Sequence, residues 1–357
     1  EGVDEDWSMP SNIRFAEYKQ LSPGDYTFRV KAANSDGVWN EEGASIKVTI
    51  IPPFWRTKWF YSLCVIAFIV GVFGFIRWRT ASIKKEKKIL EIKVEERTRE
   101  LAEKNRDITS SIQYAKRIQE AILPPIESIY SHFPDSFILY KPKDIVSGDF
   151  YWFAEKNGKK IIAAVDCTGH GVPGAFMSMI GHNLLNQIVV ENGIVDPAKI
   201  LNELHRGVQA ALKQGSNVID TSDGMDVALC CFDEKLSQVT FAGAFRPLFI
   251  LSENKLERIS GNKFSIGGAQ LDLSRQFTNH TIFLKNGDKV YMFSDGYADQ
   301  FGGDKGKKFM LKRFSDILLS FQNTSMSDQK KSLNESIESW SKGFEQVDDV
   351  LVIGISV

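Results

Sequence analysis

Apolar runs and their spacing predict most of the secondary structure in the C-terminal two-thirds of the chain. Ile161 to Val165 is a short apolar run typical of a buried strand, and Asp166 ends it with a charge. A glycine-rich turn follows, and then Pro173, which suits the first turn of a helix. We expect strands at 137–140, 150–155, 161–166, 226–232, 238–251, 281–284, 288–294 and 350–357, and helices at 173–191, 197–213, 308–321 and 327–342.

These elements indicate an α+β domain. Neighbouring strands are joined by short turns, so we expect a largely antiparallel sheet system with helices against it. The strand at 226–232 should form a hairpin with the one at 238–251. The helix at 197–213 has its own start signal, because Asp196 can cap it and Pro197 suits its first position.

The N-terminal part has a strand pattern of its own. Apolar residues alternate with polar ones at Tyr26, Phe28 and Val30 and again from Ile46 to Ile50, and Gly- and Pro-containing turns lie between them. Two or three strands are too few to stand alone. We therefore interpret residues 1–57 as the C-terminal part of a β-sandwich whose remainder lies upstream, in a longer protein.

The stretch from Trp59 to Ile76 contains 18 residues without a charge. At about 1.5 Å per helical residue it nearly crosses a hydrocarbon core of about 30 Å. Aromatic residues at both ends fit membrane interfaces, and the basic residues on the C-terminal side place that side in the cytoplasm. We expect a single-pass transmembrane helix over 58–78 in the inner (cytoplasmic) membrane, with the β-rich part outside; a buried core helix is the alternative.

A heptad pattern follows the apolar stretch. Residues that suit a helical seam recur at alternating spacings of four and three, at Val94, Thr98, Leu101, Asn105, Ile108, Ile112, Ala115, Gln119 and Ile122. Such a seam is typical of a coiled coil, in which polar residues such as Asn105 and Gln119 set the register. We expect a coiled-coil linker over 79–123 that joins two chains in a homodimer; a lone amphipathic helix packed on the next domain is the alternative.

Composition and charge give no indication of nucleic-acid binding or of a cysteine metal site. The formal net charge of −1 is uninformative about partners, and no long basic patch with interleaved aromatic residues indicates nucleic-acid binding. The four cysteines show no paired metal-ligand spacing. The remaining candidate for chemistry is the domain at 124–357.

Aspartates lie where apolar strands of that domain meet turns. They are Asp149, Asp166, Asp295 and the pair Asp348 and Asp349. Each could be an ordinary turn residue. An all-oxygen cluster without His or Cys spacing instead selects hard cations, Mg²⁺ or Mn²⁺. Two such ions could activate a water molecule and polarise a phosphoryl group, so the pattern favours phosphate ester hydrolysis.

Four motifs carry a resemblance to a known family. In this order and at these separations, they resemble the SpoIIE-type branch of the metal-dependent protein phosphatase 2C superfamily: SGDFYW, DCTGHGVPGAFMSM, FSDGYADQFGG and VDDVLVIGI. This resemblance covers residues 133–357. Residues 20–57, with IPPFWRTKWF at their end, resemble the tail of the Y_Y_Y domain that often follows β-propeller repeats in bacterial sensors.

The resemblance implies an αββα sandwich with two metal ions at one edge of its two sheets. Asp166 would bridge both ions, Asp149 would hold one, and Asp295 and Asp348 would complete the other. The backbone carbonyl of Cys167 stands where the family uses a main-chain ligand. The cofactors would be two Mn²⁺ or Mg²⁺ ions.

Other residues near the motifs are assigned weaker roles. Asp349 is the weaker ligand of its pair, and Asp226 either contacts a third ion or is a carboxylate at a hairpin edge. His170 holds the turn, because it lies four residues after Asp166 rather than two, where relatives carry a proposed general acid. Arg246 either grips substrate phosphate or is a surface arginine.

The chain departs from the family pattern at several positions. Ser147 replaces a glycine, Trp152 replaces an aspartate, Leu351 replaces a frequent threonine, and Phe245 with Arg246 replaces a more usual polar or proline-rich pair. All the expected ligands are present. The departures leave open a degenerate module that only docks signalling partners.

These expectations combine into one hypothesis. The chain is a membrane-anchored sensor in which the linker carries a change to a cytoplasmic phosphatase domain. By resemblance, that domain removes phosphate from Ser or Thr of a regulatory protein such as an anti-sigma-factor antagonist. A membrane-bound nucleotide cyclase is a further alternative, since SGDF partly resembles a cyclase signature, but the full signature is absent.

Overall fold

The computed structural model describes residues 1–214, 222–268 and 275–357, and the chain divides into two compact units, Glu1–Leu101 and Ala102–Val357. The first unit contains an antiparallel pair of strands, β1 (Gly24–Val30) and β2 (Ala44–Ile50). A short 3₁₀ turn, η1 (Phe54–Arg56), follows this pair. The expected N-terminal strands are therefore two.

One uninterrupted helix, α1 (Lys58–Ile122), contains both the apolar stretch and the heptad segment. It is long and apolar enough to cross a membrane: an 18-residue window has a mean hydropathy of 2.3, and none of that window is buried within the chain. A short helix, α2 (Ile126–His132), comes after the Pro124–Pro125 break.

Two antiparallel sheets form the centre of the second unit. The first sheet has the order β11-β7-β6-β5-β4, with β10 paired to β6, and the second has the order β3-β15-β12-β8-β9. The strands of the first sheet are β4 (Phe150–Lys156), β5 (Lys159–Cys167), β6 (Gly224–Phe232), β7 (Gln238–Ala244), β10 (Ile266–Gly267) and β11 (His280–Phe283). Those of the second are β3 (Ser136–Lys141), β8 (Leu248–Ser252), β9 (Lys255–Ile259), β12 (Lys289–Phe293) and β15 (Val350–Ser356). A small pair, β13 (Phe301–Gly302) and β14 (Lys307–Lys308), stands apart from both.

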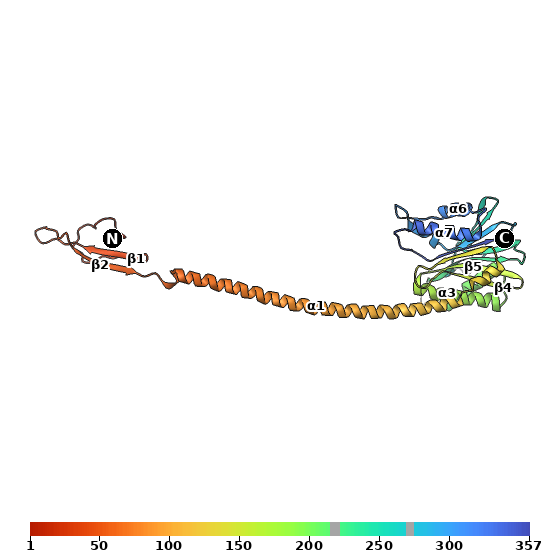
Figure 1. Cartoon of the computed structure of the whole chain (residues 1–357), viewed down its shortest axis with the longest axis horizontal. Helices are drawn as coiled ribbons and strands as arrows, with labels where there is room; N and C mark the ends of the chain where they lie inside the picture. Colours follow the sequence, from red (N-terminus) through yellow and green to blue (C-terminus); the bar gives the residue numbers. More distant parts are fainter. Residues whose placement is uncertain (215–221, 269–274) are drawn as a thin grey trace. The chain divides into compact units, whose positions relative to one another are not determined.

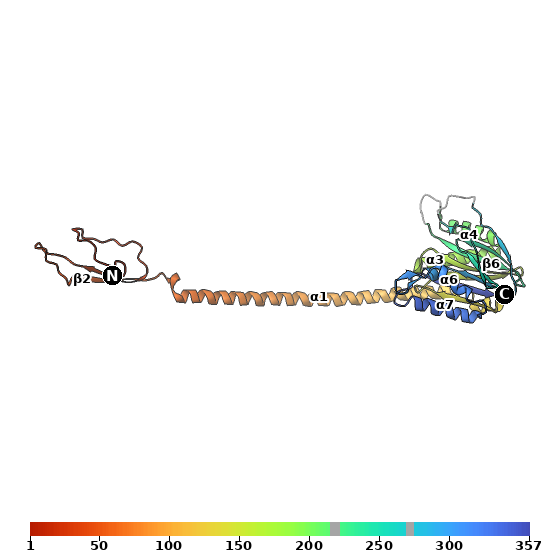
Figure 2. The same cartoon turned by 90° about the horizontal axis from the view of Figure 1, so that it is seen from above.

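Helices cover the outer face of each sheet. The first sheet is covered by α3 (Gly171–Leu185), its π-helical continuation η2 (Asn186–Glu191) and α4 (Pro197–Ala211), and α3 and α4 lie side by side (Figure 2). The second sheet is covered by α6 (Leu311–Leu319) and α7 (Met326–Trp340). Figure 1 shows α6 and α7 on the side of the sheets opposite to α3. As expected, Asp196 caps α4: its carboxylate accepts a hydrogen bond from the Lys199 N–H at 2.9 Å.

Strand alternation explains the layering. Along β5, Ile161, Ala163 and Val165 pack against the helices of the first sheet, whereas Ile162 and Ala164 pack against the second sheet. Both faces of β5 are therefore buried, and its residues form a continuous apolar run. A third apolar layer lies between the second sheet and α6 and α7. The domain is thus an α+β fold of four layers.

The expected strand over 238–251 is wrong. The chain leaves the first sheet at Ala244 and enters the second at Leu248, so β7 and β8 are separate strands in different sheets. Phe245 takes a φ of +56°, which a continuous strand cannot accommodate. The helix expected over 173–191 also differs, since α3 begins at Gly171 and gives way to η2 after Leu185.

Candidate active site

The aspartates singled out from the sequence gather at one end of the two stacked sheets. Asp166 lies near the end of β5, and Asp226, near the start of β6, is its cross-strand partner. Asp149 immediately precedes β4, which pairs with β5. In the second sheet, Asp295 follows β12 and directly precedes α5 (Gly296–Asp299), and Asp348 comes shortly before β15. Antiparallel pairing brings these strand ends to the same edge.

Three glycines allow the first two motifs to touch. A Cβ atom added to Gly148 would lie 2.4 Å from the Gly169 carbonyl oxygen, and one added to Gly174 would lie 2.3 Å from the same oxygen. The Gly174 Cβ would also lie 2.8 Å from the Gly148 Cα. Only glycine permits this backbone approach. The loop before Asp149 therefore rests directly on the turn after Asp166.

Asp349 holds the loop that carries Asp149. Its Oδ1 accepts a hydrogen bond from the Lys143 N–H and its Oδ2 accepts one from the Gly148 N–H, both at 2.7 Å. The side chain is only 2% exposed. Both carboxylate oxygens of Asp349 are thus engaged by backbone amides, and this residue positions the neighbouring loop.

Gln119 of α1 also holds this loop. Its Nε2 donates to the Ser147 carbonyl at 2.6 Å and to the Ser178 Oγ at 2.8 Å, and its Oε1 accepts from the Ser147 N–H at 3.1 Å. The sequence predicted Gln119 as a polar residue of a coiled-coil seam. The structure buries the Gln119 side chain against Ser147 and Ser178 of the same unit, which fits the alternative of a helix packed on the next domain.

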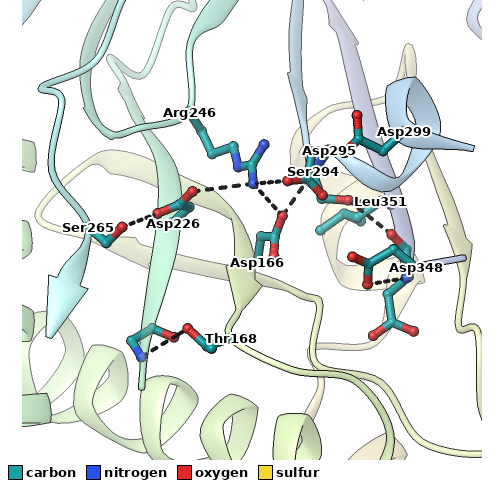
Figure 3. A network of polar contacts seen from close by, with 12 residues as sticks. Asp166, Thr168, Asp226, Arg246, Ser265, Ser294, Asp295, Asp299, Asp348 and Leu351 are labelled. Carbon is teal, nitrogen blue, oxygen red and sulfur yellow. Dashed lines mark hydrogen bonds and ion pairs between the residues drawn. The ribbon is translucent and has the colours of Figure 1, made fainter. Parts of the chain in front are cut away.

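Arg246 lies among the carboxylates, as Figure 3 shows. Its Nη2 atom is 2.8 Å from Asp166 Oδ2, 2.7 Å from Asp295 Oδ2 and 3.3 Å from Asp226 Oδ2. Asp226 also accepts a hydrogen bond from the Ser265 hydroxyl at 2.5 Å. The reading of Arg246 as a surface arginine is wrong, because its side chain is only 14% exposed. Asp226 lies next to Val227, the last residue of β6 that pairs with β7, and so stands at the edge of that hairpin.

Burial and neighbouring negative charges raise the pKa values of four carboxyl groups in the cluster. Burial raises the pKa of Asp166 to about 7, although the Arg246 guanidinium opposes the shift. Burial, followed by the charge of Asp166, raises the pKa of Asp149 well above its usual range. Burial also raises the pKa values of Asp226 and Asp348, and the charge of Asp295 contributes to both. The cluster is short of positive charge.

The donor set fits a hard divalent cation. All candidate side-chain ligands are carboxylates, and Asp149 Oδ2 is buried with no hydrogen-bond partner among the described residues. In residues 1–214, 222–268 and 275–357, however, no three His, Cys, Asp or Glu side chains are arranged to hold one metal ion. The guanidinium of Arg246 stands between three of the carboxylates.

The departures from the family pattern at Trp152 and Leu351 are explained by packing. Trp152 is fully buried in the core beneath α3, and its Nε1 donates to Asn186 Oδ1 at 3.0 Å. Leu351 is fully buried between the two sheets. His170 contacts Asp144, with 2.6 Å between Nδ1 and Oδ2, and so ties the turn to a neighbouring loop.

Sequence reasoning undervalued Arg246, Asp226 and Gln119. The one sequence signal for Arg246 was that the pair Phe245 and Arg246 departs from the family pattern. For Gln119 there was no such signal. The heptad spacing is the same whether a helix packs against a second helix or against its own domain.

Comparisons with known proteins agree with this geometry. The family model for stage II sporulation protein E (SpoIIE) matches residues 156–357, and the model for the Y_Y_Y domain matches residues 1–50. The SiaA-PP2C domain of Pseudomonas aeruginosa is 30% identical with a TM-score of 0.64; the match covers 71% of this chain and 98% of that one.

Two further relatives match parts of the chain. A structure of the SpoIIE PP2C phosphatase domain with a fragment of its regulatory domain, from Bacillus subtilis, shares the fold with a TM-score of 0.50 and 20% identity, covering 62% of this chain and 61% of that one. Histidine kinase P4 of Formosa agariphila is 30% identical over 144 residues, which is 39% of this chain and 10% of that protein. The chain thus matches about a tenth of that curated relative. It belongs to the SpoIIE family, with a PP2C-type serine phosphatase domain and an N-terminal Y_Y_Y domain fragment.

Proposed function

We propose that residues 124–357 form a metal-dependent protein serine/threonine phosphatase that acts on a phosphorylated regulatory protein. The observation that carries this proposal is the cluster of carboxylates where the two sheets end, in which Asp149 is buried and Asp166 is largely buried. Asp149 and Asp166 come from one sheet, and Asp295 and Asp348 come from the other. Burying so many anions costs free energy unless cations or protons compensate.

In the proposed enzyme, Asp149, Asp166, Asp295 and Asp348 hold two Mn²⁺ or Mg²⁺ ions. The Cys167 carbonyl is a further ligand, and Asp349 keeps the loop of Asp149 in place through the Lys143 and Gly148 amides. Divalent ions in such a site supply Lewis-acid activation of water and neutralise charge on the phosphoryl group. The Cys167 thiol takes no part, because burial raises its pKa well above the usual range.

The rest of the chain anchors and regulates this domain. The exposed apolar part of α1 crosses the inner membrane once, so that the Y_Y_Y fragment lies outside and the phosphatase domain lies in the cytoplasm. Residues 79–123 pair two chains and transmit the signal, with Gln119 at the domain end of this segment. An anti-sigma-factor antagonist is the substrate class that fits a SpoIIE-type domain.

The test is Asp166→Asn in the full chain, assayed for Mn²⁺-dependent hydrolysis of a phosphoserine peptide. We expect hydrolysis to fall by at least a hundredfold, because the substitution would remove a carboxylate on which metal binding depends. Asp316→Asn, at an exposed position of α6, is the matched control and should leave hydrolysis unchanged. Undiminished turnover by a folded Asp166→Asn variant would remove the two-metal mechanism.

A non-catalytic docking module is the second candidate, and the position of Arg246 in the cluster favours it. In that case the guanidinium is a permanent substitute for metal. Calorimetric titration with Mn²⁺ separates the two candidates, because a docking module of this kind binds no Mn²⁺ and a phosphatase binds it. Incubation with GTP or ATP tests the remaining cyclase alternative.

A further inference from the structure

The turn between β7 and β8 fixes the backbone of Arg246. The Phe245 N–H donates to the Asn262 carbonyl at 2.8 Å, and the Arg246 N–H donates to the Ala244 carbonyl at 2.6 Å. A Cβ atom at Gly243 would lie 2.4 Å from the Arg246 carbonyl oxygen. The backbone of the turn is therefore held by hydrogen bonds and by close contact with Gly243, so that movement of the guanidinium falls to the long side chain of Arg246.

The ion pairs of the Arg246 guanidinium are concentrated on one of its nitrogen atoms. Nη2 makes all three of these carboxylate contacts, whereas Nε is buried without a hydrogen-bond partner in the described part of the chain. An arginine placed for structural support alone would use more of its five N–H groups. The contacts of Arg246 thus resemble those of a single cation that sits at a point between three anions.

The three carboxylates need a cation even without metal. Asp166 and Asp226 face each other across β5 and β6, and like charges in that position destabilise a sheet. Asp295 adds a third negative charge. One guanidinium leaves these three negative charges only partly compensated, and the nearby Asp149 Oδ2 is buried without a hydrogen-bond partner among the residues that the structure describes.

We propose that Arg246 is the resident cation of the metal-free cluster and that a divalent ion enters by displacing its guanidinium from Asp166 and Asp295. This rests on the proposed function, because it takes these two aspartates as metal ligands. A guanidinium and a divalent ion cannot occupy the same carboxylate oxygens. Metal affinity is therefore reduced by the free energy needed to release Arg246, as for any site that is open only part of the time.

The experiment is calorimetric titration of Mn²⁺ into the metal-stripped full chain in detergent micelles, with thermal unfolding of the metal-free protein as a second readout. Arg246→Met removes the competing charge, so its Kd for Mn²⁺ should fall at least tenfold. Its melting temperature without metal should also fall, because three carboxylates lose their counter-ion. Arg206→Met, at an exposed arginine of α4 paired with Glu203, is the control and should change neither value.

Arg246→Lys keeps the charge but not the planar fork, and it serves if Arg246→Met does not fold. Its Kd for Mn²⁺ should lie between those of the wild type and Arg246→Met, and should still be below the wild-type value. If the folded variants bound Mn²⁺ no more tightly than the wild type, the proposed displacement of Arg246 by metal would be wrong, and the proposed function would be unaffected. Absence of Mn²⁺ binding by the wild type and by the variants would overturn both.

Discussion

The side-chain amide of Gln119 donates a hydrogen bond to the backbone carbonyl of Ser147, 2.6 Å away, and the Ser147 N–H donates back to Gln119 Oε1. This reciprocal pair joins the last turn of α1 to the loop that carries Asp149. A third bond, to the Ser178 hydroxyl, adds helix α3. One buried side chain therefore connects three segments that are far apart in the sequence.

Replacing Gln119 with leucine should destabilise the domain by about 2 kcal/mol or more, because buried polar groups of Ser147 and Ser178 lose their partner. The loop should also relax, so that more Mn²⁺ is needed for half-maximal hydrolysis. Urea unfolding and a Mn²⁺ titration measure the two effects. Gln113→Leu, at an exposed position of the same helix, should shift stability by no more than about 0.5 kcal/mol. Equal stability of the two variants would contradict the role of Gln119.

Replacing Gly174 with alanine should push the first two motifs apart. The new Cβ would meet the Gly169 carbonyl and the Gly148 Cα, and both are backbone atoms that cannot rotate away. We expect a loss of about 1–3 kcal/mol in the free energy of unfolding and weaker Mn²⁺ binding, since Gly148 precedes Asp149.

The matched control is Gly207→Ala, whose Cβ would meet only the flexible end of the Leu184 side chain. That variant should lose little stability, because alanine also favours the helix. If Gly174→Ala bound Mn²⁺ as tightly as Gly207→Ala, the close backbone contact would not matter for the site.

His205 should make the domain less stable at mildly acidic pH. Its Nδ1 accepts a hydrogen bond from the Gly267 N–H at 3.0 Å, which requires the neutral ring, and burial lowers its pKa. Below about pH 6.5, His205 is protonated in the unfolded chain but stays neutral in the folded chain. The free energy of unfolding therefore falls as the pH drops below this value.

Other groups titrate in the same range, so the informative quantity is a difference between variants. His205→Asn keeps an acceptor but does not titrate, and its urea midpoint should decline less between pH 7.5 and 5.5 than that of the wild type. Parallel curves for the two proteins would contradict the assignment.

Local patterns predicted much of the fold. The run from Ile161 to Val165 is buried on both faces of β5, and the cap at Asp196 begins α4 as expected. The break between β7 and β8 was not predicted, because the apolar pattern continues through it. A strand that passes from one sheet to another differs from a straight strand only at the turn, where Phe245 has a positive φ.

The residue pattern alone predicted the candidate site as a set of strand-end aspartates, and the family resemblance implied that they meet at one edge of the two sheets. Asp166 and Asp295 could be proposed one by one, since each ends an apolar run. Their shared contact with Arg246 could not be predicted from the sequence, because that contact depends on how β5, β7 and β12 are placed in space. The burial of Gln119 likewise depends on which surface α1 meets, and heptad spacing is the same for either partner.

The passage from β7 into β8 has a mechanical consequence. The segment that bears Arg246 is one of the covalent connections between the two sheets, and its guanidinium contacts Asp166 and Asp226 in one sheet and Asp295, which follows a strand of the other. Any shear of one sheet over its neighbour must stretch or release those ion pairs. The ion pairs of Arg246 are therefore coupled to any movement of one sheet relative to the other.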